Sequence, residues 1–409
     1  MHMRRLVGTV SALAVLAACA SDKHASVDIA AARASNTTTT GADAFISPAT
    51  TSGLSATTTP TTSAAPVATT TAAPPEMQPA PHPTKVTSAP PRVPAAPIPP
   101  APTPPAPTVA GQRPANGSPT SLGRCSLFPR SSYWYANVST LPVRANSSAY
   151  IASIGATSGL KADFGSGLWD GGPIGIPYVV VPAGQVKVPV AFDYADESEP
   201  GPYPIPTDAP IEGGAQSTGD RHVLVVDQTD CHLYETWSST PTGAGWHAGS
   251  GAVFDLTSNA LRPDGWTSAD AAGLAILPGL VRYDEVAAGH IDHAIRITVP
   301  RTQKTYLWPA RHQASSRTDT NLPPMGLWLR LRADFDTSGF PHDAQVILEA
   351  LKQHGAIVAD NGSAWYMSGA PDERWNNDTL ATLHRVPGSA FEAVDVSSMI
   401  ANPNSGQVR

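Results

Sequence analysis

The sequence predicts an all-β or β-rich domain of the sandwich or jelly-roll type with helical insertions, preceded by a long segment that has no core of its own. Roughly half of the 42 prolines lie between residues 36 and 119, whereas all nine tryptophans lie at or after Trp134. After residue 120, short strand-like runs follow one another, separated by Gly and Pro turns. A helix expected between two of these strands leaves an α+β fold with a mixed sheet as the alternative.

Residues 1–19 have the pattern of an export signal. Arg4 and Arg5 precede a short apolar stretch over residues 6–18, of signal-peptide rather than membrane-spanning length. The stretch ends in Leu-Ala-Ala-Cys19, which resembles the bacterial lipoprotein box, in which the Cys becomes the lipidated first residue. We expect lipid on Cys19 to anchor the protein to a bacterial membrane, outside the cytoplasm in the cell envelope. An ordinary signal peptide cleaved nearby is the alternative.

Residues 20–119 are expected to form a disordered tether. From residue 36 to residue 118 the chain consists mainly of Thr, Ala and Pro, with almost no aromatics and few charges. Such a segment cannot bury enough apolar surface to offset its chain entropy. Proline-rich stretches favour the extended polyproline form, about 3.1 Å per residue, so we expect the tether to hold the next domain away from the membrane.

The cysteine count supports an oxidising location. Lipidation of Cys19 leaves Cys125 and Cys231, and two remaining cysteines in an exported domain usually join. We therefore predict a Cys125–Cys231 disulfide, with two buried free thiols as the alternative.

Residues 120–409 are expected to form the globular domain, with more strands than helices. The residues at 223–226 are continuously apolar, which indicates a strand covered on both faces. The best helix lies at 341–354, with Pro341 near its start and Gly355 as its stop. The other expected strands are 177–181, 186–194, 221–227, 231–237, 291–299, 326–335, 356–360 and 391–396, and the other expected helices are 268–272, 281–288 and 377–384.

Composition and motifs exclude several classes of protein. The formal net charge of −7 argues against a nucleic-acid partner, which requires clustered basic residues. The sequence contains no Cys-x-x-Cys, His-Glu-x-x-His, phosphate loop or Gly-x-Ser-x-Gly elbow. Zinc-protease and serine-hydrolase mechanisms therefore lack their usual signatures.

Several long blocks resemble a widespread family of secreted bacterial proteins whose activity is uncharacterised. The resemblance spans about residues 120–397 and is carried by blocks at 219–223 (GDRHV), 250–256 (SGAVFDL), 262–273 (RPDGWTSADAAG), 278–286 (PGLVRYDEV), 322–326 (LPPMG) and 359–363 (ADNGS). It implies a shared domain and an extracytoplasmic location, and no particular reaction.

A short acidic turn is a candidate calcium site. Asp334, Asp336 and Ser338 form the Asp-x-Asp-x-Ser-Gly start of a calcium loop, but the closing position is Gln345 in place of Glu. The alternative is a strand-to-helix turn in which these side chains cap backbone amides. Apart from a calcium ion at this turn, we expect no cofactor.

Candidate catalytic residues come from acidic and histidine-containing segments. We selected Glu285 and Asp360 as acid/base carboxylates and His293 as an orienting base. Expected substrate contacts are Arg296, Trp365, Trp266 and His312. For His293 and for these tryptophans, a role in an ordinary core is the alternative. His293 could also ligate a metal together with His312.

These residues favour a lipid-anchored protein that acts on or binds a polysaccharide, as a glycoside hydrolase. The alternatives are a non-catalytic module for glycan or peptidoglycan and a structural surface protein. The enzyme interpretation requires the candidate groups named above to gather in one cleft, and finding them scattered over the domain would count against it. Aromatic residues aligned on an open face, without a deep pocket of clustered acids, favour the binding module.

Overall fold

The computed structural model describes residues 122–409. The export signal with Cys19 and the tether over residues 20–119 lie outside the described residues, so both remain predictions. Within the described residues, no helix is both long and apolar enough to cross a membrane.

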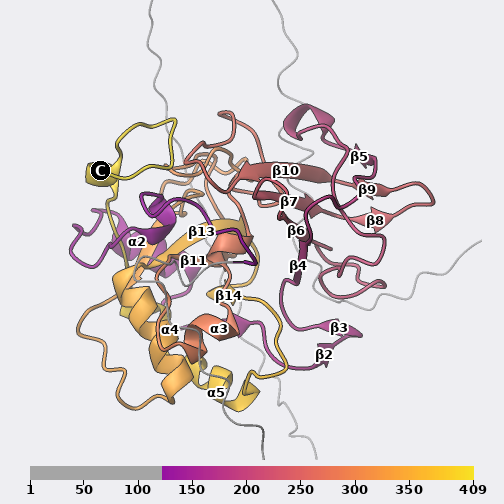
Figure 1. Cartoon of the computed structure of the whole chain (residues 1–409). Helices are drawn as coiled ribbons and strands as arrows, with labels where there is room; N and C mark the ends of the chain where they lie inside the picture. The colour runs from indigo at the N-terminus through magenta and orange to yellow at the C-terminus, as the bar shows by residue number, and fades with distance from the viewer. Residues whose placement is uncertain (1–121) are drawn as a thin grey trace, which may run out of the picture. The chain divides into compact units, whose positions relative to one another are not determined.

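The described domain is strand-rich, with two large sheets that mix parallel and antiparallel pairs (Figure 1). In the six-stranded sheet the β1–β14 and β11–β13 pairs are parallel. Its strands, in spatial order, are β1 (Lys161–Asp163), β14 (Tyr366–Ser368), β11 (Ile295–Val299), β13 (Ala356–Asn361), β12 (Trp328–Leu331) and β15 (Phe391–Ala393). In the four-stranded sheet only the β4–β6 pair is parallel. Its order is β10 (Ser250–Asp255), β7 (His232–Trp237), β6 (Val223–Asp227) and β4 (Tyr178–Val181).

Smaller elements complete the fold. Two minor sheets consist of β2 (Leu168–Trp169) with β3 (Gly172–Pro173), and of β5 (Val190–Phe192), β9 (Trp246–Ala248) and β8 (Thr240–Pro241). The helices are α2 (Ser147–Ile154), α3 (Tyr283–Ala287), α4 (His342–Gln353) and α5 (Asn377–Ala381). The 3₁₀ turns are η1 (Tyr133–Tyr135), η2 (Ala195–Glu197), η3 (Leu277–Gly279), η4 (Thr382–Arg385), η5 (Gly388–Ala390) and η6 (Ser397–Met399).

Strand β6 separates two apolar cores. All five of its residues are buried. Leu224 and Val226 belong to the large core, which also covers the six-stranded sheet, whereas Val223 and Val225 belong to a smaller core on the opposite face. Alternation along the strand sends neighbouring side chains to opposite faces, so a continuous apolar run is what a doubly covered strand requires. This prediction is confirmed.

Helix α4 lies close to the predicted bounds. Its apolar face is buried through Ala344, Ile347 and Leu351, among others. Gly355, just after the helix, has φ +70, and a Cβ there would lie 2.6 Å from the carbonyl oxygen of Leu329. The stop is therefore a glycine for both conformational and steric reasons.

The predicted strand-rich class is confirmed, but its sandwich or jelly-roll form is not, and the mixed sheets leave the α+β alternative open. The helix expected at 268–272 is absent, because this segment forms bends and turns. Its polar groups bond locally instead, as when Ser268 Oγ accepts the Asp270 N–H at 2.8 Å.

The predicted disulfide is confirmed. Cys125 and Cys231 are joined with a Cα–Cα distance of 5.4 Å across 106 residues of sequence. The bond fastens the first described segment to the start of β7, so it restricts a long loop of the unfolded chain.

We predict that replacing both cysteines with Ala lowers the free energy of unfolding by about 2–5 kcal/mol, because the unfolded chain loses its cross-link. Denaturant unfolding of the full chain measures this difference. Reductant should destabilise the wild-type protein and leave the double variant unchanged. Equal stability of the two oxidised proteins would contradict the prediction.

Candidate active site

A cavity of about 930 Å³ lies between the two large sheets and is lined by residues from both. Arg296 on β11 and Asp360 on β13 line it from the six-stranded sheet, and Trp237 on β7 and Ser250 on β10 line it from the four-stranded sheet. The volume is at the upper end of the roughly 300–1,000 Å³ that small-molecule sites occupy. The cavity is therefore large enough for a ligand of several joined rings.

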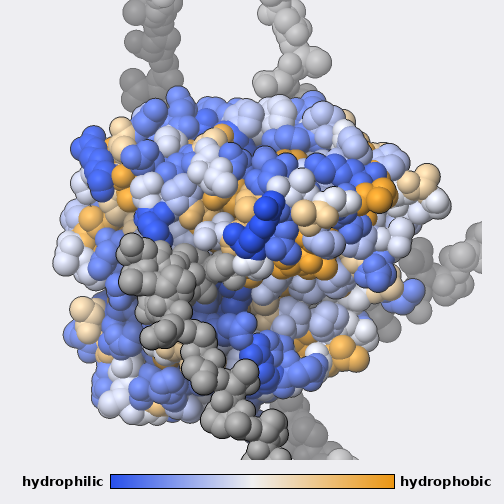
Figure 2. Space-filling view, in the orientation of Figure 1, coloured by the Kyte–Doolittle hydropathy of each residue, from blue (hydrophilic) through white to orange (hydrophobic). Residues whose placement is uncertain are grey.

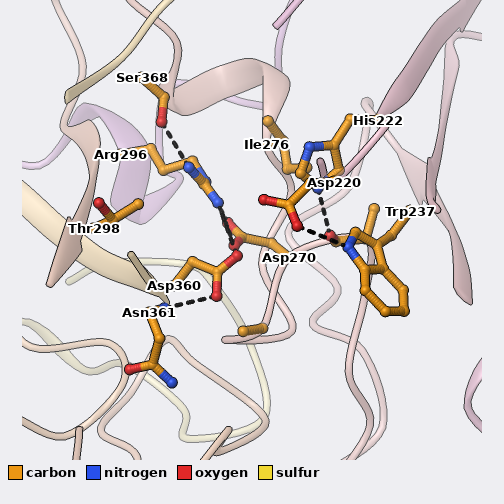
Figure 3. A network of polar contacts seen from close by, with 12 residues as sticks. Asp220, His222, Trp237, Asp270, Ile276, Arg296, Thr298, Asp360, Asn361 and Ser368 are labelled. Atoms are coloured by element: carbon orange, nitrogen blue, oxygen red, sulfur yellow. Dashed lines mark hydrogen bonds and ion pairs between the residues drawn. The ribbon is translucent and has the colours of Figure 1, made fainter. Parts of the chain in front are cut away.

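Arg296 organises the first group of polar residues. Its guanidinium makes a bidentate pair with Asp270, through Nε to Oδ2 and Nη2 to Oδ1, both at 2.9 Å. Nη1 donates to Ser368 Oγ at 2.6 Å, and Nη2 also donates to Asp360 Oδ2 at 3.2 Å. One buried cation thus serves two carboxyl groups, as Figure 3 shows. Burial raises the pKa of Asp270 as well, although the charge and hydrogen bonds of Arg296 oppose this shift. The bidentate geometry favours Asp270 as the ionised member of the pair.

Asp360 is the more exposed of the two carboxyl groups in this cluster. Its side chain is 22% exposed, whereas that of Asp270 is fully buried. Burial, followed by the charge of Asp270, raises the pKa of Asp360 to about 8, although Arg296 opposes this shift. Near neutral pH Asp360 is therefore largely protonated and able to give up a proton.

A bulge in β13 sets the position of Asp360. The pairing of β11 with β13 shifts between Ile297 and Thr298, so that Ile297 is opposite Val358 but Thr298 is opposite Asp360. Ala359 is the extra residue, and its carbonyl accepts the Ala272 N–H at 2.9 Å. The bulge thus places Asp360 beside a cavity-lining residue of the neighbouring strand.

His222 organises the second group of polar residues. It is 1% exposed, and its Nε2 lies 3.0 Å from the carbonyl oxygen of Ala269 while its Nδ1 lies 2.6 Å from Glu212 Oε2. Both partners accept, so both ring nitrogens carry protons. Burial lowers the pKa of His222, but the charge and hydrogen bond of Glu212 outweigh it and raise the pKa to about 9. His222 is therefore an imidazolium ion that joins the 212–222 region to the loop carrying Asp270.

Asp220 lies beside His222 and is exposed to the cavity. The indole Nε1 of Trp237 donates to Asp220 Oδ1 at 3.2 Å, which orients the carboxylate. Figure 3 shows this pair next to the Asp360–Asp270–Arg296 cluster. The charge of Asp220 adds to the rise in the pKa of Asp360. The cavity thus contains two carboxyl groups in unequal surroundings.

Three of the residues selected from the sequence line this cavity. These are Asp360, Arg296 and His312, whose Nδ1 donates to the carbonyl oxygen of Ala271 at 2.9 Å. Asp360 and Arg296 are in direct contact, as a catalytic cluster requires.

Glu285 and His293 do not line the cavity. Glu285 Oε2 lies 3.2 Å from His293 Nε2, and Arg282 donates to the same carboxylate. The side chains of Glu285 and His293 are each 2% exposed. Arg282 lowers the pKa of Glu285 against the effect of burial. This triad joins α3 to the start of β11, and its groups already satisfy one another. The structure therefore does not bring Glu285 and His293 together with Asp360.

Both tryptophans that were predicted as substrate contacts also lie outside the cavity. Trp365 is completely buried, stacks on Phe391 with ring centroids 4.8 Å apart, and donates from Nε1 to the Gly155 carbonyl at 2.8 Å. The guanidinium carbon of Arg262 lies 5.5 Å from the ring centroid of Trp266. Trp365 is thus a core residue, and Trp266 packs on an arginine.

The acidic turn at 334–338 has the geometry of a capped turn. Asp336 Oδ1 accepts the Ser338 N–H at 2.9 Å, and Asp334 pairs with Arg332 at 3.2 Å. The Ser338 hydrogen bonds lower the pKa of Asp336. Asp336 thus makes the contact of the alternative interpretation, in which a side chain satisfies a backbone amide, whereas Asp334 pairs with an arginine side chain.

Within the described residues, the group with metal-ligand spacing is Glu212, Asp220 and His222, whose ligand atoms lie within 4.8 Å of one another. A metal-bound histidine is neutral and offers a free nitrogen. Both nitrogens of His222 are engaged as donors, so the arrangement fits an ion pair better than a metal centre.

Sequence reasoning did not select Glu212, Asp220, His222 or Trp237. One usable signal was present, since Asp220 and His222 directly precede the doubly buried strand β6. Polar residues at the end of such a strand must find partners outside the apolar cores. Asp270 lies within the helix expected at 268–272, and nothing in the local sequence identifies it as the partner of Arg296.

We predict that Glu212→Gln lowers the pKa of His222 below its wild-type value of about 9, because the variant loses the charge that opposes burial. NMR titration of the imidazole measures this pKa directly. A pKa raised above the ordinary 6.5 means that the pair stabilises the fold fully below about pH 6.5, and that this contribution is lost as the pH rises through about 9. The wild-type advantage in unfolding free energy over Glu212→Gln should therefore shrink over that range. An unchanged His222 titration in the variant would contradict the assignment.

In comparisons with known proteins, no family model, no curated protein and no solved structure matches this chain.

Proposed function

We propose that the described domain is a glycoside hydrolase that cleaves an envelope or environmental polysaccharide, with Asp360 as general acid and Asp220 as the second carboxylate. The observation that carries the proposal is their placement in one cavity, one beside a buried carboxylate and the other beside an indole N–H. Glycoside hydrolysis requires two carboxyl groups that differ in protonation state.

The surroundings of each group support its role. Asp360 shares Arg296 with the fully buried Asp270, and the nearby negative charge favours the protonated form that donates to a glycosidic oxygen. Asp220 is exposed and bonded to Trp237, so its ionised form is available to activate water or to attack the sugar carbon. Asp270 and Arg296 act as positioning residues.

Trp237 supplies a flat surface beside Asp220. Its ring lies on Gly249, where a Cβ would lie 2.3 Å from the Trp237 ring atom Cε3. Tyr194 lies next to it, with ring centroids 6.5 Å apart. Both aromatic residues line the cavity, and the apolar face of a sugar ring packs well on such a surface.

A non-catalytic glycan-binding or peptidoglycan-binding module is the second candidate. It is favoured by the aromatic residues alone, whereas the gathering of Asp220, Asp270 and Asp360 in a cavity favours the enzyme. Both candidates share the proposed location, a lipid anchor at Cys19 with a tether that gives the domain reach. We also propose that the two large sheets form a sandwich-like arrangement.

We predict that Asp360→Asn and Asp220→Asn each lower kcat about 10²–10⁴-fold, because each removes one proton-transfer group. Full-length protein is incubated with glucan, mannan, arabinan, galactan, chitosan and peptidoglycan, and new reducing ends are measured. Asp336→Asn, an exposed acid outside the cavity, is the matched control and should retain activity. Retention of a polysaccharide without release of products would favour the binding module. If no polysaccharide is retained and none is cleaved, both candidate functions are wrong.

We predict that kcat/KM falls as the pH rises through about 8. Asp360 acts in its protonated form, and its pKa is raised to about 8, so the active fraction decreases above that pH. Initial rates from pH 5 to pH 10 on the substrate found above measure the profile, with a stability control at each pH. Activity that increases up to pH 10 would contradict Asp360 as the acid.

A further inference from the structure

The β2–β3 hairpin carries exposed apolar side chains at the edge of the cavity. Trp169 is 78% exposed and Leu168 70% exposed, and they are two of the four large apolar residues exposed in the described part of the chain. Trp169 also lines the cavity, whereas Leu168 does not. Figure 1 shows the hairpin extending from the body of the domain below β4, and Figure 2 shows a surface on which hydrophilic residues predominate and apolar patches are small.

The hairpin sequence leaves one face of Trp169 uncovered. Trp169 pairs with Gly172 across the hairpin, so the opposite position carries no side chain. The connecting Asp170 and Gly171 have φ of +50 and +87, the positive values of a tight two-residue hairpin turn. The turn is therefore short, and the indole at its tip stays exposed to solvent.

The base of the hairpin is firmly held. The Gly165 N–H donates to the Ile174 carbonyl at 3.0 Å, and Asn377 Oδ1 accepts the Ser166 N–H at 2.9 Å. Gly172 lies against Gly213, where a Cβ would lie 2.0 Å from the carbonyl carbon. Gly213 follows Glu212, the partner of His222. The backbone that carries the exposed indole is thus held relative to the polar groups of the cavity.

The charge of the cavity limits what this indole can bind. Six carboxyl-bearing residues line the cavity (Asp163, Glu197, Glu212, Asp220, Asp270 and Asp360), compared with the three cationic residues Lys161, His222 and Arg296. His222 pairs with Glu212, Arg296 pairs with two aspartates, and Lys161 donates to Tyr366 at 2.8 Å. Carboxyl groups thus outnumber cations around the cavity, which disfavours a sugar that carries a carboxylate or phosphate.

We propose that Trp169 forms a separate sugar-binding subsite at the mouth of the cavity, which takes a neutral or amine-bearing pyranose ring of the glycan whose adjoining part lies in the cavity. This inference rests on the proposed function, because it assigns the next ring of the same substrate. An exposed indole packs against the apolar face of a sugar, and its place on a held hairpin gives the sugar chain a direction of entry.

The test compares Trp169→Ala with the control Leu168→Ala, a neighbouring exposed residue that does not line the cavity. Full-length protein carrying Asp360→Asn is titrated with hexamers of chitin, chitosan and oligogalacturonate, and binding is measured by calorimetry. We expect the chitin or the chitosan hexamer to bind, and Trp169→Ala to weaken that binding about three- to tenfold. Leu168→Ala should have no effect, Trp169→Phe should retain most of the affinity, and oligogalacturonate should not bind.

Kinetics with Asp360 intact separate the subsite from the reaction. On the polysaccharide that is cleaved, Trp169→Ala should raise KM with kcat unchanged, whereas Asp360→Asn lowers kcat. If Asp360→Asn abolishes activity but Trp169→Ala changes neither KM nor hexamer affinity, the subsite is wrong and the proposed function stands. Failure of both neutral and amine-bearing hexamers to bind, or tighter binding of oligogalacturonate, overturns the substrate class. If Trp169→Ala sediments differently from the wild-type protein but binds the hexamers with the same affinity, the subsite is wrong and the hairpin tip instead contacts a second copy of the chain.

Discussion

The buried guanidinium of Arg296 is the group on which the geometry and the charge balance of the cavity both depend. It comes from an interior strand of the six-stranded sheet and is 4% exposed, so its desolvation must be offset by close partners. Asp270 provides two bonds and Asp360 one. This unequal sharing keeps one carboxylate ionised and leaves the other able to hold a proton. The contact that stabilises the buried charge thus also makes the two acids chemically different.

A second buried cation joins this cluster to the four-stranded sheet. His222 donates to the carbonyl oxygen of Ala269, the residue before Asp270, and to Glu212 on the other side. Nearby, the completely buried Glu235 accepts the N–H groups of Ile276 and Leu277, and burial raises its pKa to about 7. Such a network is stable only when its members are satisfied together. The polar groups between the two large sheets therefore help to hold the sheets in one arrangement.

The sequence was informative where a pattern is local. The apolar run at 223–226 and the helix before Gly355 were predicted because burial period and stop signals lie within a few residues. The cysteine pair followed from counting. The cavity could not be predicted in this way, because Arg296 finds its partners 26 and 64 residues away. Glu285 and His293 had suggestive spacing, but Arg282 satisfies Glu285 locally. Trp365 and Trp169 both adjoin turn residues, and local sequence does not reveal which ring turns inward.

The bulge in β13 makes the position of the acid depend on strand register as well as on residue type. If the regular ladder continued from the Ile297–Val358 pair, Thr298 would be opposite Ala359 and Asp360 would be opposite Val299, on the other face of the strand. The same residues in a regular register would therefore turn the proton donor away from the cavity. Related chains are therefore best compared by the register of this strand pair, since an aligned aspartate alone does not establish a shared chemistry.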